Sequence, residues 1–161
     1  MKGSDLIAEM VASGRIRGIG FGSPVADVES AFPLDCVDDE DDEGLSLRRD
    51  YGLVEFFFNG GPEWVVVGAS VEVHRLATDP ALQEEWRRIQ GVDFPEYLTW
   101  EDVERSLSRL PVAPGLRVSR DQTGYVEYRS IDTRVSVLVV DGPEERHHRP
   151  GGGDVFSVAL G

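Results

Sequence analysis

The chain has 161 residues, of which 30 are acidic and 16 basic, and its formal net charge is −14. Such a surface repels the phosphate backbone of nucleic acids and the anionic headgroups of membranes, so the sequence excludes both as partners. The same charge attracts a basic protein and accelerates its association, although it also serves solubility alone. With 40% hydrophobic residues, the composition is that of a folded globular chain.

Cysteine content and the first residues bear on the compartment. Cys36 is the only cysteine, so no internal disulfide can form. The opening residues, MKGSDLIAEMVASG, contain no apolar run of signal-peptide length, and no later stretch is long enough to span a bilayer. We therefore expect a cytoplasmic protein, with export by a machine that needs no cleavable signal as the alternative.

Two short helices are predicted near the beginning of the chain. Apolar residues recur at helical spacing over residues 4–12, and Gly14 ends that helix. Pro24 favours the start of a second helix, which runs to about Phe32.

An acidic run and three strands follow. The six consecutive acids from Asp38 to Glu43 cannot pack against a core and predict a solvated loop. Strand-like segments are then predicted at residues 45–49, 53–58 and 64–73, the last two separated by the turn sequence NGGP.

The middle and the second half of the chain show similar patterns. A connecting helix over residues 82–89 has Asp79 as its N-cap, and Thr99 caps a further helix that runs to about Leu110. A loop rich in Gly, Pro and His, residues 141–153, is expected to be exposed and mobile. Strands are predicted at residues 116–120, 125–130, 134–140 and 155–160.

The most specific signal is a similarity between the two halves. LSLRRD-YGLVEFFF, from Leu45, aligns with LRVSRDQTGYVEYRS, from Leu116, and upstream the letters DVE from Asp27 align with DVE from Asp102. The alignment matches Arg49-Asp50 with Arg120-Asp121, and Val54-Glu55 with Val126-Glu127. Chance similarity between two unrelated hairpins is the alternative, because turn sequences are common.

This similarity predicts an α+β fold. We expect two tandem helix-plus-antiparallel-sheet repeats, residues 15–76 and 98–161, joined by a connecting helix in residues 77–97 and forming one compact unit. The helices should pack on one face of the sheet or sheets.

The aligned turns carry a local prediction of their own. Gly52 and Gly124 should adopt positive φ, and Asp50 and Asp121 should accept hydrogen bonds from nearby backbone N–H groups.

The sequence also resembles known families. Gly20-Phe21-Gly22-Ser23-Pro24 with Val28, followed by the strand Tyr51-Gly52-Leu53-Val54-Glu55-Phe56, resembles the tandem α/β repeats of the β-lactamase inhibitory protein family and of related outer-membrane lipoprotein assembly domains. The likeness covers about residues 17–75 and, more weakly, 98–161. The chain lacks that family's secretion signal and cysteines, so inhibition of β-lactamase is not implied.

A second resemblance bears on function. The strand pattern YG-x-x-E-F, at Tyr51 to Phe56, is similar to one carried by many small acidic immunity proteins of bacterial polymorphic toxin systems. That resemblance implies that the chain binds and neutralises a cognate toxin.

No catalytic, cofactor or metal site is predicted. The glycine loop from Gly18 to Gly22 lacks the spacing of a dinucleotide fingerprint, and no Walker lysine accompanies it. His147 and His148 are adjacent, so their side chains do not converge on a metal, and the acidic run lacks the order of a calcium-binding EF-hand loop. Acids beside Cys36 should raise its thiol pKa, which opposes activation.

Two glutamates recur at matching positions of the two halves. Glu55 and Glu127 occupy equivalent strand positions and are either paired carboxylates for acid–base chemistry or solvent-facing parts of the fold. We expect the second, because their recurrence follows from the repeat itself.

Together these observations predict a non-catalytic protein-binding chain, an immunity- or inhibitor-type protein that neutralises a basic partner. Consecutive aromatics point to opposite faces of a strand, so Phe57 should join an exposed patch unless Trp86 of the connecting helix covers it. The alternatives are a homo-oligomeric structural or scaffold protein and a small-ligand binding protein or enzyme that uses the groove between the repeats. The expected contact residues are Asp38, Asp39, Glu40, Asp41, Asp42, Phe57 and Trp64.

Overall fold

The computed structural model describes residues 1–161 and contains helices together with one eight-stranded sheet. None of its helices is both long enough and apolar enough to cross a membrane. The helical segments are α1 (Gly3–Ser13), α2 (Val25–Ala31), η1 (Val73–Ala77), α3 (Pro80–Glu85), η2 (Trp86–Gln90) and α4 (Trp100–Ser108). The strands are β1 (Val37–Glu40), β2 (Ser46–Asp50), β3 (Val54–Asn59), β4 (Val65–Val71), β5 (Leu116–Arg120), β6 (Tyr125–Ser130), β7 (Val135–Val140) and β8 (Val155–Leu160).

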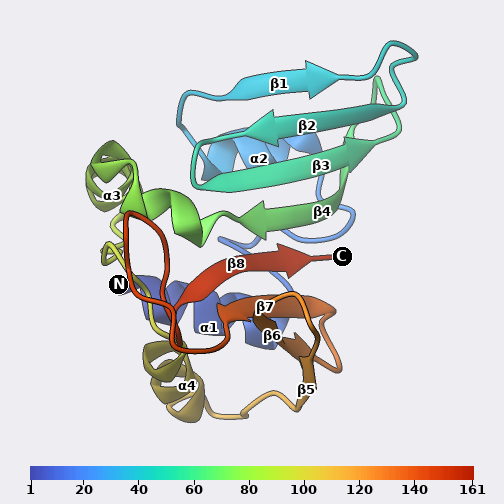
Figure 1. Ribbon diagram of the computed structural model, residues 1–161. Helices are drawn as coiled ribbons and strands as arrows, with labels where there is room; N and C mark the ends of the chain where they lie inside the picture. Colours follow the sequence, from blue (N-terminus) through green and yellow to red (C-terminus); the bar gives the residue numbers. More distant parts are fainter.

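The sheet is antiparallel throughout, with the strand order β1-β2-β3-β4-β8-β7-β6-β5. Strands β1 to β4 form one meander and β5 to β8 form another (Figure 1). The two meanders join where β8 pairs with β4, through Val71 opposite Val158 and Ala69 opposite Leu160. The predicted α+β class is confirmed, and the seven predicted strands are all present close to their expected bounds.

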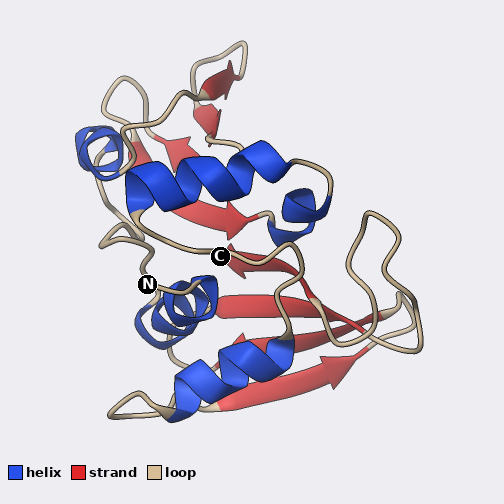
Figure 2. Ribbon diagram, turned by 90° about the vertical axis from the view of Figure 1, so that its left-hand side faces the viewer, coloured by secondary structure: helices blue, strands red, loops and turns tan.

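The core lies between the sheet and the helices. Helices α1 and α2 lie behind the sheet in Figure 1, and Figure 2 shows the helices standing in front of the strands when the molecule is viewed from its left-hand side. On β3, Val54, Phe56 and Phe58 alternate towards this side and are fully buried, as the period of two along a strand requires. Thirty-four buried hydrophobic residues from both meanders form one cluster, so both halves share a single core.

Capping side chains set the helix starts that the sequence predicts. Thr99 Oγ1 accepts a hydrogen bond from Asp102 N at 3.1 Å, and Asp79 Oδ1 accepts one from Ala81 N at 3.1 Å. The predicted connecting helix is present as α3, which continues into the π-helical turn η2 and ends at Gly91, in the left-handed conformation with φ 65°.

The two aligned turns have the expected geometry. Gly52 and Gly124 adopt φ of 89° and 91°. Asp50 Oδ1 accepts a hydrogen bond from Gly52 N at 2.7 Å, and Asp121 Oδ1 accepts one from Thr123 N at 2.9 Å. These local predictions are confirmed, because only a residue without a side chain adopts this backbone freely.

The surroundings of these glycines differ, which gives a testable contrast. A Cβ at Gly52 would lie 2.7 Å from Leu82 Cδ2, whereas one at Gly124 would meet no atom within 4 Å. Gly124→Ala should cost about 1–2 kcal/mol through backbone strain. Gly52→Ala should cost roughly 1 kcal/mol more, because Leu82 must also move. Urea unfolding of both variants measures the difference, and equal losses would contradict the contact with Leu82.

The acidic run departs from the expected solvated loop. Residues 37–40 form β1, an edge strand whose four side chains are all exposed. An edge strand pairs on one side only, so charged side chains can remain in water there and also discourage pairing with other chains. Asp41 to Gly44 form the turn into β2, in which Asp41 Oδ1 accepts hydrogen bonds from Leu45 N at 2.7 Å and Ser46 N at 3.1 Å.

The loop of residues 141–153 has the expected exposure, since residues 142–149 are all exposed, and it also carries an anchor to the strand that follows it. Asp154 is 1% exposed and accepts two hydrogen bonds from Arg146, at 2.8 and 2.7 Å. Gly151 N donates to the same carboxylate at 2.8 Å, and the Arg146 guanidinium lies over the ring of Tyr97. Composition did not reveal this anchor, because the ion pair involves only one residue inside the loop and one just beyond it.

Candidate functional site

The sheet has one face without helices over it, which we call the outer face (Figure 1). A row of direct strand partners crosses it, from Asp39 on β1 to Arg48 on β2, Phe57 on β3 and Gly68 on β4. Because directly paired residues point to the same face, these four side-chain positions lie next to one another. The row therefore brings an acid, a base, an aromatic ring and a residue without a side chain together.

Apolar side chains are exposed around this row. Phe57 is 37% exposed, and Val65 and Val67 are each 36% exposed. A register shift opposite Phe57 and Phe58 leaves Val67 without a direct partner, so it accompanies Val65 outward. We call Phe57, Val65 and Val67 the apolar patch.

Trp86 does not cover this patch. Its ring is fully buried between Phe32 and Phe94, at centroid distances of 6.0 and 5.8 Å, within the core on the other side of the sheet. The expectation that Phe57 points outward is therefore correct, and the alternative in which Trp86 shields it is wrong.

A network of ion pairs occupies the end of the outer face beside the patch. Glu55 Oε1 lies 3.2 Å from Arg48 Nη1 and 3.1 Å from Arg75 Nη2, and the Glu55 side chain is only 6% exposed. Arg75 Nη1 also donates to Gly52 O at 2.7 Å and lies 3.2 Å from Asp50 Oδ1. Burial of the Arg75 guanidinium opposes its charge, but the hydrogen bond to Glu55 and the field of Asp50 raise its pKa above the ordinary value.

This network argues against a proton-transfer role for the two recurring glutamates. Glu55 is already occupied by ion pairs with two arginines, at 3.2 and 3.1 Å. Glu127 lies on β6, four strand positions away in the sheet order, which corresponds to roughly 19 Å at about 4.8 Å per strand. They therefore cannot act as a carboxylate pair on one substrate atom.

The acids of β1 and its turn serve different purposes. Asp38 pairs with Arg49 through two hydrogen bonds of 2.8 and 2.9 Å, and these lower the pKa of the Asp38 carboxyl. Asp39, Glu40 and Asp42 are exposed, and the closest basic group to Asp39 is Arg48, at 4.0 Å. Of the five predicted acidic contacts, these three have exposed side chains, and Asp39 is the one that points to the outer face, because Glu40 is the strand partner of the core residue Leu47.

Asp38→Asn should lower the free energy of unfolding by about 0.5–1 kcal/mol at pH 7, because the pair is partly exposed. Since the pKa of Asp38 is lowered by folding, its stabilisation is fully present above the ordinary value of about 4 and is lost as the pH falls through the folded-state value. Urea unfolding at pH 7 and at about pH 2 should therefore show the variant and the wild type converging in acid. Asp42→Asn is the matched control. A loss that is equally large in acid would contradict this role for the charge.

Trp64 lies apart from the apolar patch. It is partly buried and packs against the core cluster. Its ring lies over the β3–β4 turn, where a Cβ on Gly61 would come within 2.5 Å of Trp64 Cζ2. Phe57 and Trp64 were predicted together as contacts, but they do not lie on one surface. Trp64 directly precedes β4 and packs on the core side of the sheet, whereas Phe57 points to the outer face.

The sequence prediction did not include several residues of this site, namely Arg48, Val65, Val67 and the ion-pair network around Glu55. Alternation along β4 signals that Val65 and Val67 share a face. No local pattern signals that Arg75, from a different element, reaches Glu55.

The residues that could bind a metal or act as a nucleophile are not arranged for either role. No three His, Cys, Asp or Glu side chains gather as metal ligands do. Cys36 is exposed, but the protein around its thiol removes part of the surrounding water, and this partial desolvation raises the thiol pKa. Asp38 and Asp35 make smaller contributions in the same direction. His147 is exposed in the anchored loop and lies 3.5 Å from Glu145.

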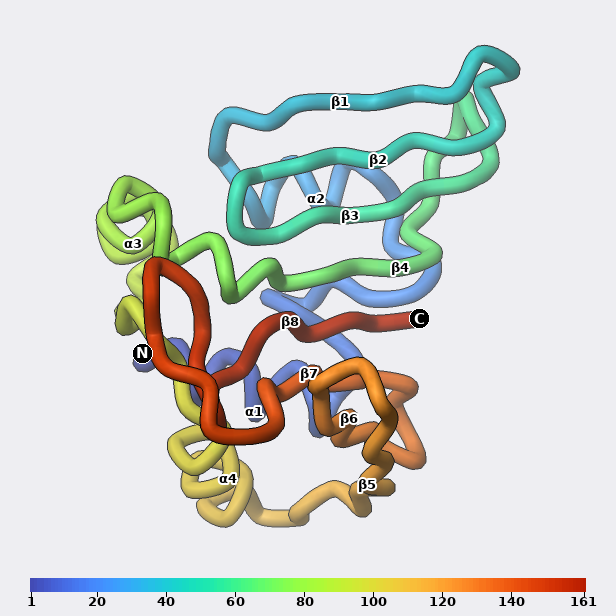
Figure 3. The backbone as a smooth tube through the Cα atoms, in the orientation of Figure 1, coloured from blue at the N-terminus to red at the C-terminus, as the bar shows by residue number.

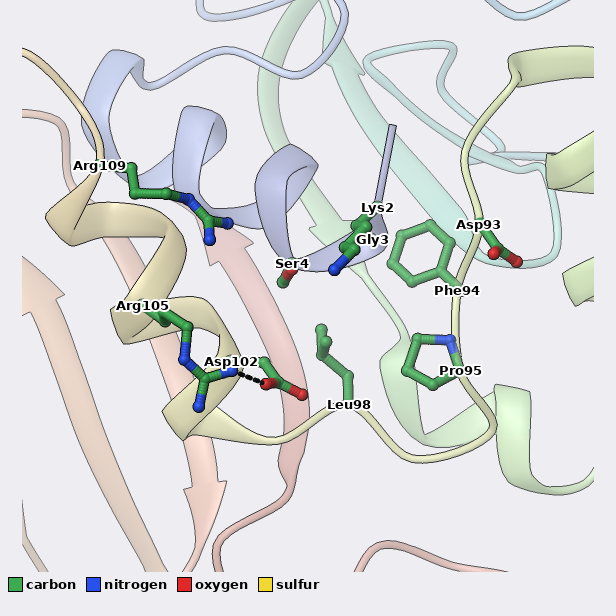
Figure 4. A pocket seen from close by; sticks show the side chains of 10 residues that line it. All are labelled: Lys2, Gly3, Ser4, Asp93, Phe94, Pro95, Leu98, Asp102, Arg105 and Arg109. Carbon is green, nitrogen blue, oxygen red and sulfur yellow. Dashed lines mark hydrogen bonds and ion pairs between the residues drawn. The ribbon is translucent and has the colours of Figure 1, made fainter.

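A hollow of about 320 Å³ lies between the start of α1, residues 93–98 and α4 (Figure 4). Its arginines are already neutralised, since Arg105 lies 2.7 Å from Asp102 and Arg109 lies 3.1 Å from Asp5. A hydrogen bond from Ser106, followed by those from Arg109, lowers the pKa of Asp5. We interpret these contacts as a structural junction between α1 and α4.

The sequence matches no protein-family model, and no curated protein matches it. A solved structure with some similarity is that of the DUF4309 family protein YjgB from Bacillus subtilis subsp. subtilis strain 168. It is 15% identical, with a TM-score of 0.45, and the match covers 98% of this chain and 93% of that chain. We draw no functional argument from a likeness at this level.

Proposed function

We propose that this chain is a non-catalytic, cytoplasmic protein that binds and neutralises a basic protein, in the manner of an immunity or inhibitor protein. The observation that carries the proposal is the apolar patch on the helix-free outer face, where Asp39 points outward in the same row, together with the exposed acids Glu40 and Asp42 of β1 and its turn.

The patch suits a protein partner better than a small molecule. Aromatic side chains near the centre of a contact supply much of its binding energy, and Phe57 is the aromatic residue of the patch. The surrounding acids would steer a basic partner during encounter and set its orientation. The Glu55 network supports the patch from beside it, because it fixes Arg48 next to Phe57.

We also propose that the fold derives from two related units, each a helix followed by a three-stranded meander. Val28 on α2 and Val103 on α4 are aligned and both fully buried, and Gly52 and Gly124 share one conformation. The units are β2–β4 and β5–β7, while β1 and β8 lie outside the alignment and differ in position. Duplication would thus have left one unit free to specialise in binding, since the second carries no ion-pair network around Glu127.

The proposal is tested by comparing retention of cell proteins on immobilised wild type and on the Phe57→Ala variant. A partner that uses the patch should bind the variant at least about 30-fold more weakly, the scale of a central aromatic contact. Val118→Ala, which changes another exposed apolar residue on β5, is the matched control. If every retained protein binds wild type and Phe57→Ala equally, the patch is not the contact surface.

The charge contribution is tested separately on the captured partner. Replacing Asp39, Glu40 and Asp42 with their amides should slow association about tenfold at low salt and much less at high salt. Neutralising Glu9, Glu104 and Glu144, three exposed acids elsewhere, gives the same change in net charge and should have a smaller effect. An equal effect of both sets would mean that net charge, not the acids around β1, attracts the partner. Light scattering of the chain alone tests the homo-oligomeric alternative, which a strict monomer would contradict.

A further inference from the structure

Three arginines surround a small hollow at the far end of the sheet. The hollow has a volume of about 170 Å³ and is lined by Arg117 on β5, Arg129 on β6 and Arg134 at the start of β7, with Ser130 and Ile131. Strands β5 and β1 form opposite edges of the sheet (Figure 3), so this site is separate from the apolar patch and its acids.

None of the three guanidinium groups has an aspartate or glutamate partner, and Arg129 alone lies near the main-chain oxygen of Gly161, the last residue of the structure. No Asp or Glu carboxylate lies within 4.0 Å of Arg117, Arg129 or Arg134. Arg117 and Arg129 are moreover direct partners across β5 and β6, and like charges in that position repel one another. In a chain with 30 acids and 16 bases, three arginines that surround one hollow without an Asp or Glu partner are not explained by fold stability.

The Arg129 guanidinium and the Arg134 backbone are also held in place. Arg129 Nη1 donates to Ser136 Oγ at 2.9 Å, and its Nη2 lies 3.4 Å from Gly161 O. Arg134 has a φ of 61°, a conformation that non-glycine residues rarely adopt. Groups fixed before a ligand arrives lose less freedom on binding, which favours affinity.

We propose that Arg117, Arg129 and Arg134 form a binding site for a tetrahedral oxyanion of the phosphate class. Guanidinium groups match the oxygens of phosphate in geometry as well as charge. The volume of about 170 Å³ is below the roughly 300 Å³ at which pockets begin to enclose drug-sized ligands. The site therefore fits inorganic phosphate or a single phosphoryl group whose carrier remains outside.

The test is an NMR titration of the arginine Nε–H signals of the full chain with inorganic phosphate, at constant ionic strength kept with chloride. We expect saturable shifts at Arg117 and Arg129 with a dissociation constant in the millimolar range. Arg117→Gln, which removes no hydrogen bond seen in the structure, should weaken binding at least tenfold. Arg134→Asn should do so as well, since Asn tolerates its backbone conformation. Arg88→Gln, an exposed arginine without an ion pair, should leave binding unchanged.

Other outcomes would overturn the proposal. Equal shifts with chloride alone would show that ions merely screen the repulsion between the arginines. Unchanged affinity in Arg117→Gln and Arg134→Asn would place phosphate elsewhere. A parallel titration with phosphoserine, in buffer without inorganic phosphate, distinguishes free phosphate from a phosphoryl group on a carrier. Only a site that leaves room for the carrier binds both ligands. Since none of these measurements involves Phe57 or a protein partner, their failure would leave the proposed function unaffected.

Discussion

Arg146→Met should lower the free energy of unfolding by roughly 3–5 kcal/mol, because it leaves a buried carboxylate without its charged partner. Asp154 is 1% exposed and loses two hydrogen bonds in this variant, keeping only the one from Gly151 N. Methionine retains an apolar stem of similar length, so the loss reports mainly on the guanidinium and its contacts with Asp154 and Tyr97. Urea unfolding at pH 7, followed by tryptophan fluorescence, measures it.

The double variant Arg146→Met with Asp154→Asn separates the pair from its surroundings. It should recover most of the stability, since removing both charges removes the unpaired anion. Arg149→Met, three residues away in the same loop, has an exposed side chain without an ion pair and should change stability by no more than about 0.5 kcal/mol. Similar losses in Arg146→Met and Arg149→Met would show that the anchor does not stabilise the fold.

Trp86→Ala is the second substitution with a large expected effect, a loss of about 3–5 kcal/mol. The side chain is fully buried between Phe32 and Phe94, so its removal leaves a cavity where η2 meets the core. Its Nε1 has no hydrogen-bond partner, so the loss comes from packing alone. Trp86→Phe should accordingly cost far less, about 1–2 kcal/mol, because it also removes that unsatisfied N–H.

Trp64→Ala is the matched control for this experiment. Trp64 is only partly buried, and its removal should cost about 1–2 kcal/mol. It also bears on binding, because Trp64 packs on the core side rather than beside Phe57. Thermal and urea unfolding measure the stabilities, and a Trp64→Ala loss as large as that of Trp86→Ala would contradict the difference in burial.

Local chemistry explains which parts of the fold could be predicted. The caps at Thr99 and Asp79 and the turns at Gly52 and Gly124 depend on neighbouring residues only, so the sequence contains what is needed. Strand β1 was missed because its stability comes from pairing with β2 and from Arg49, neither of which is visible in a run of acids.

The candidate sites show the same division. Alternation correctly turns Phe57 outward on β3 and places Val65 and Val67 on one face of β4, but the register shift opposite Phe57 has no sequence signature. Arg75 reaching Glu55 and the three arginines around one hollow depend on elements that are distant along the chain. The type of a residue indicates what kind of contact it can make, but only the fold determines which residues it contacts.

The position of β8 has a consequence for how the chain acquires its fold. This strand lies at the centre of the sheet, yet residues 155–160 are synthesised after both of its neighbours, β4 and β7. Contacts between segments so far apart in sequence form slowly, since a long loop must close first. Until then β4 and β7 are open edges that can pair with foreign strands. On the ribosome, β8 therefore closes the sheet only after the other seven strands have emerged.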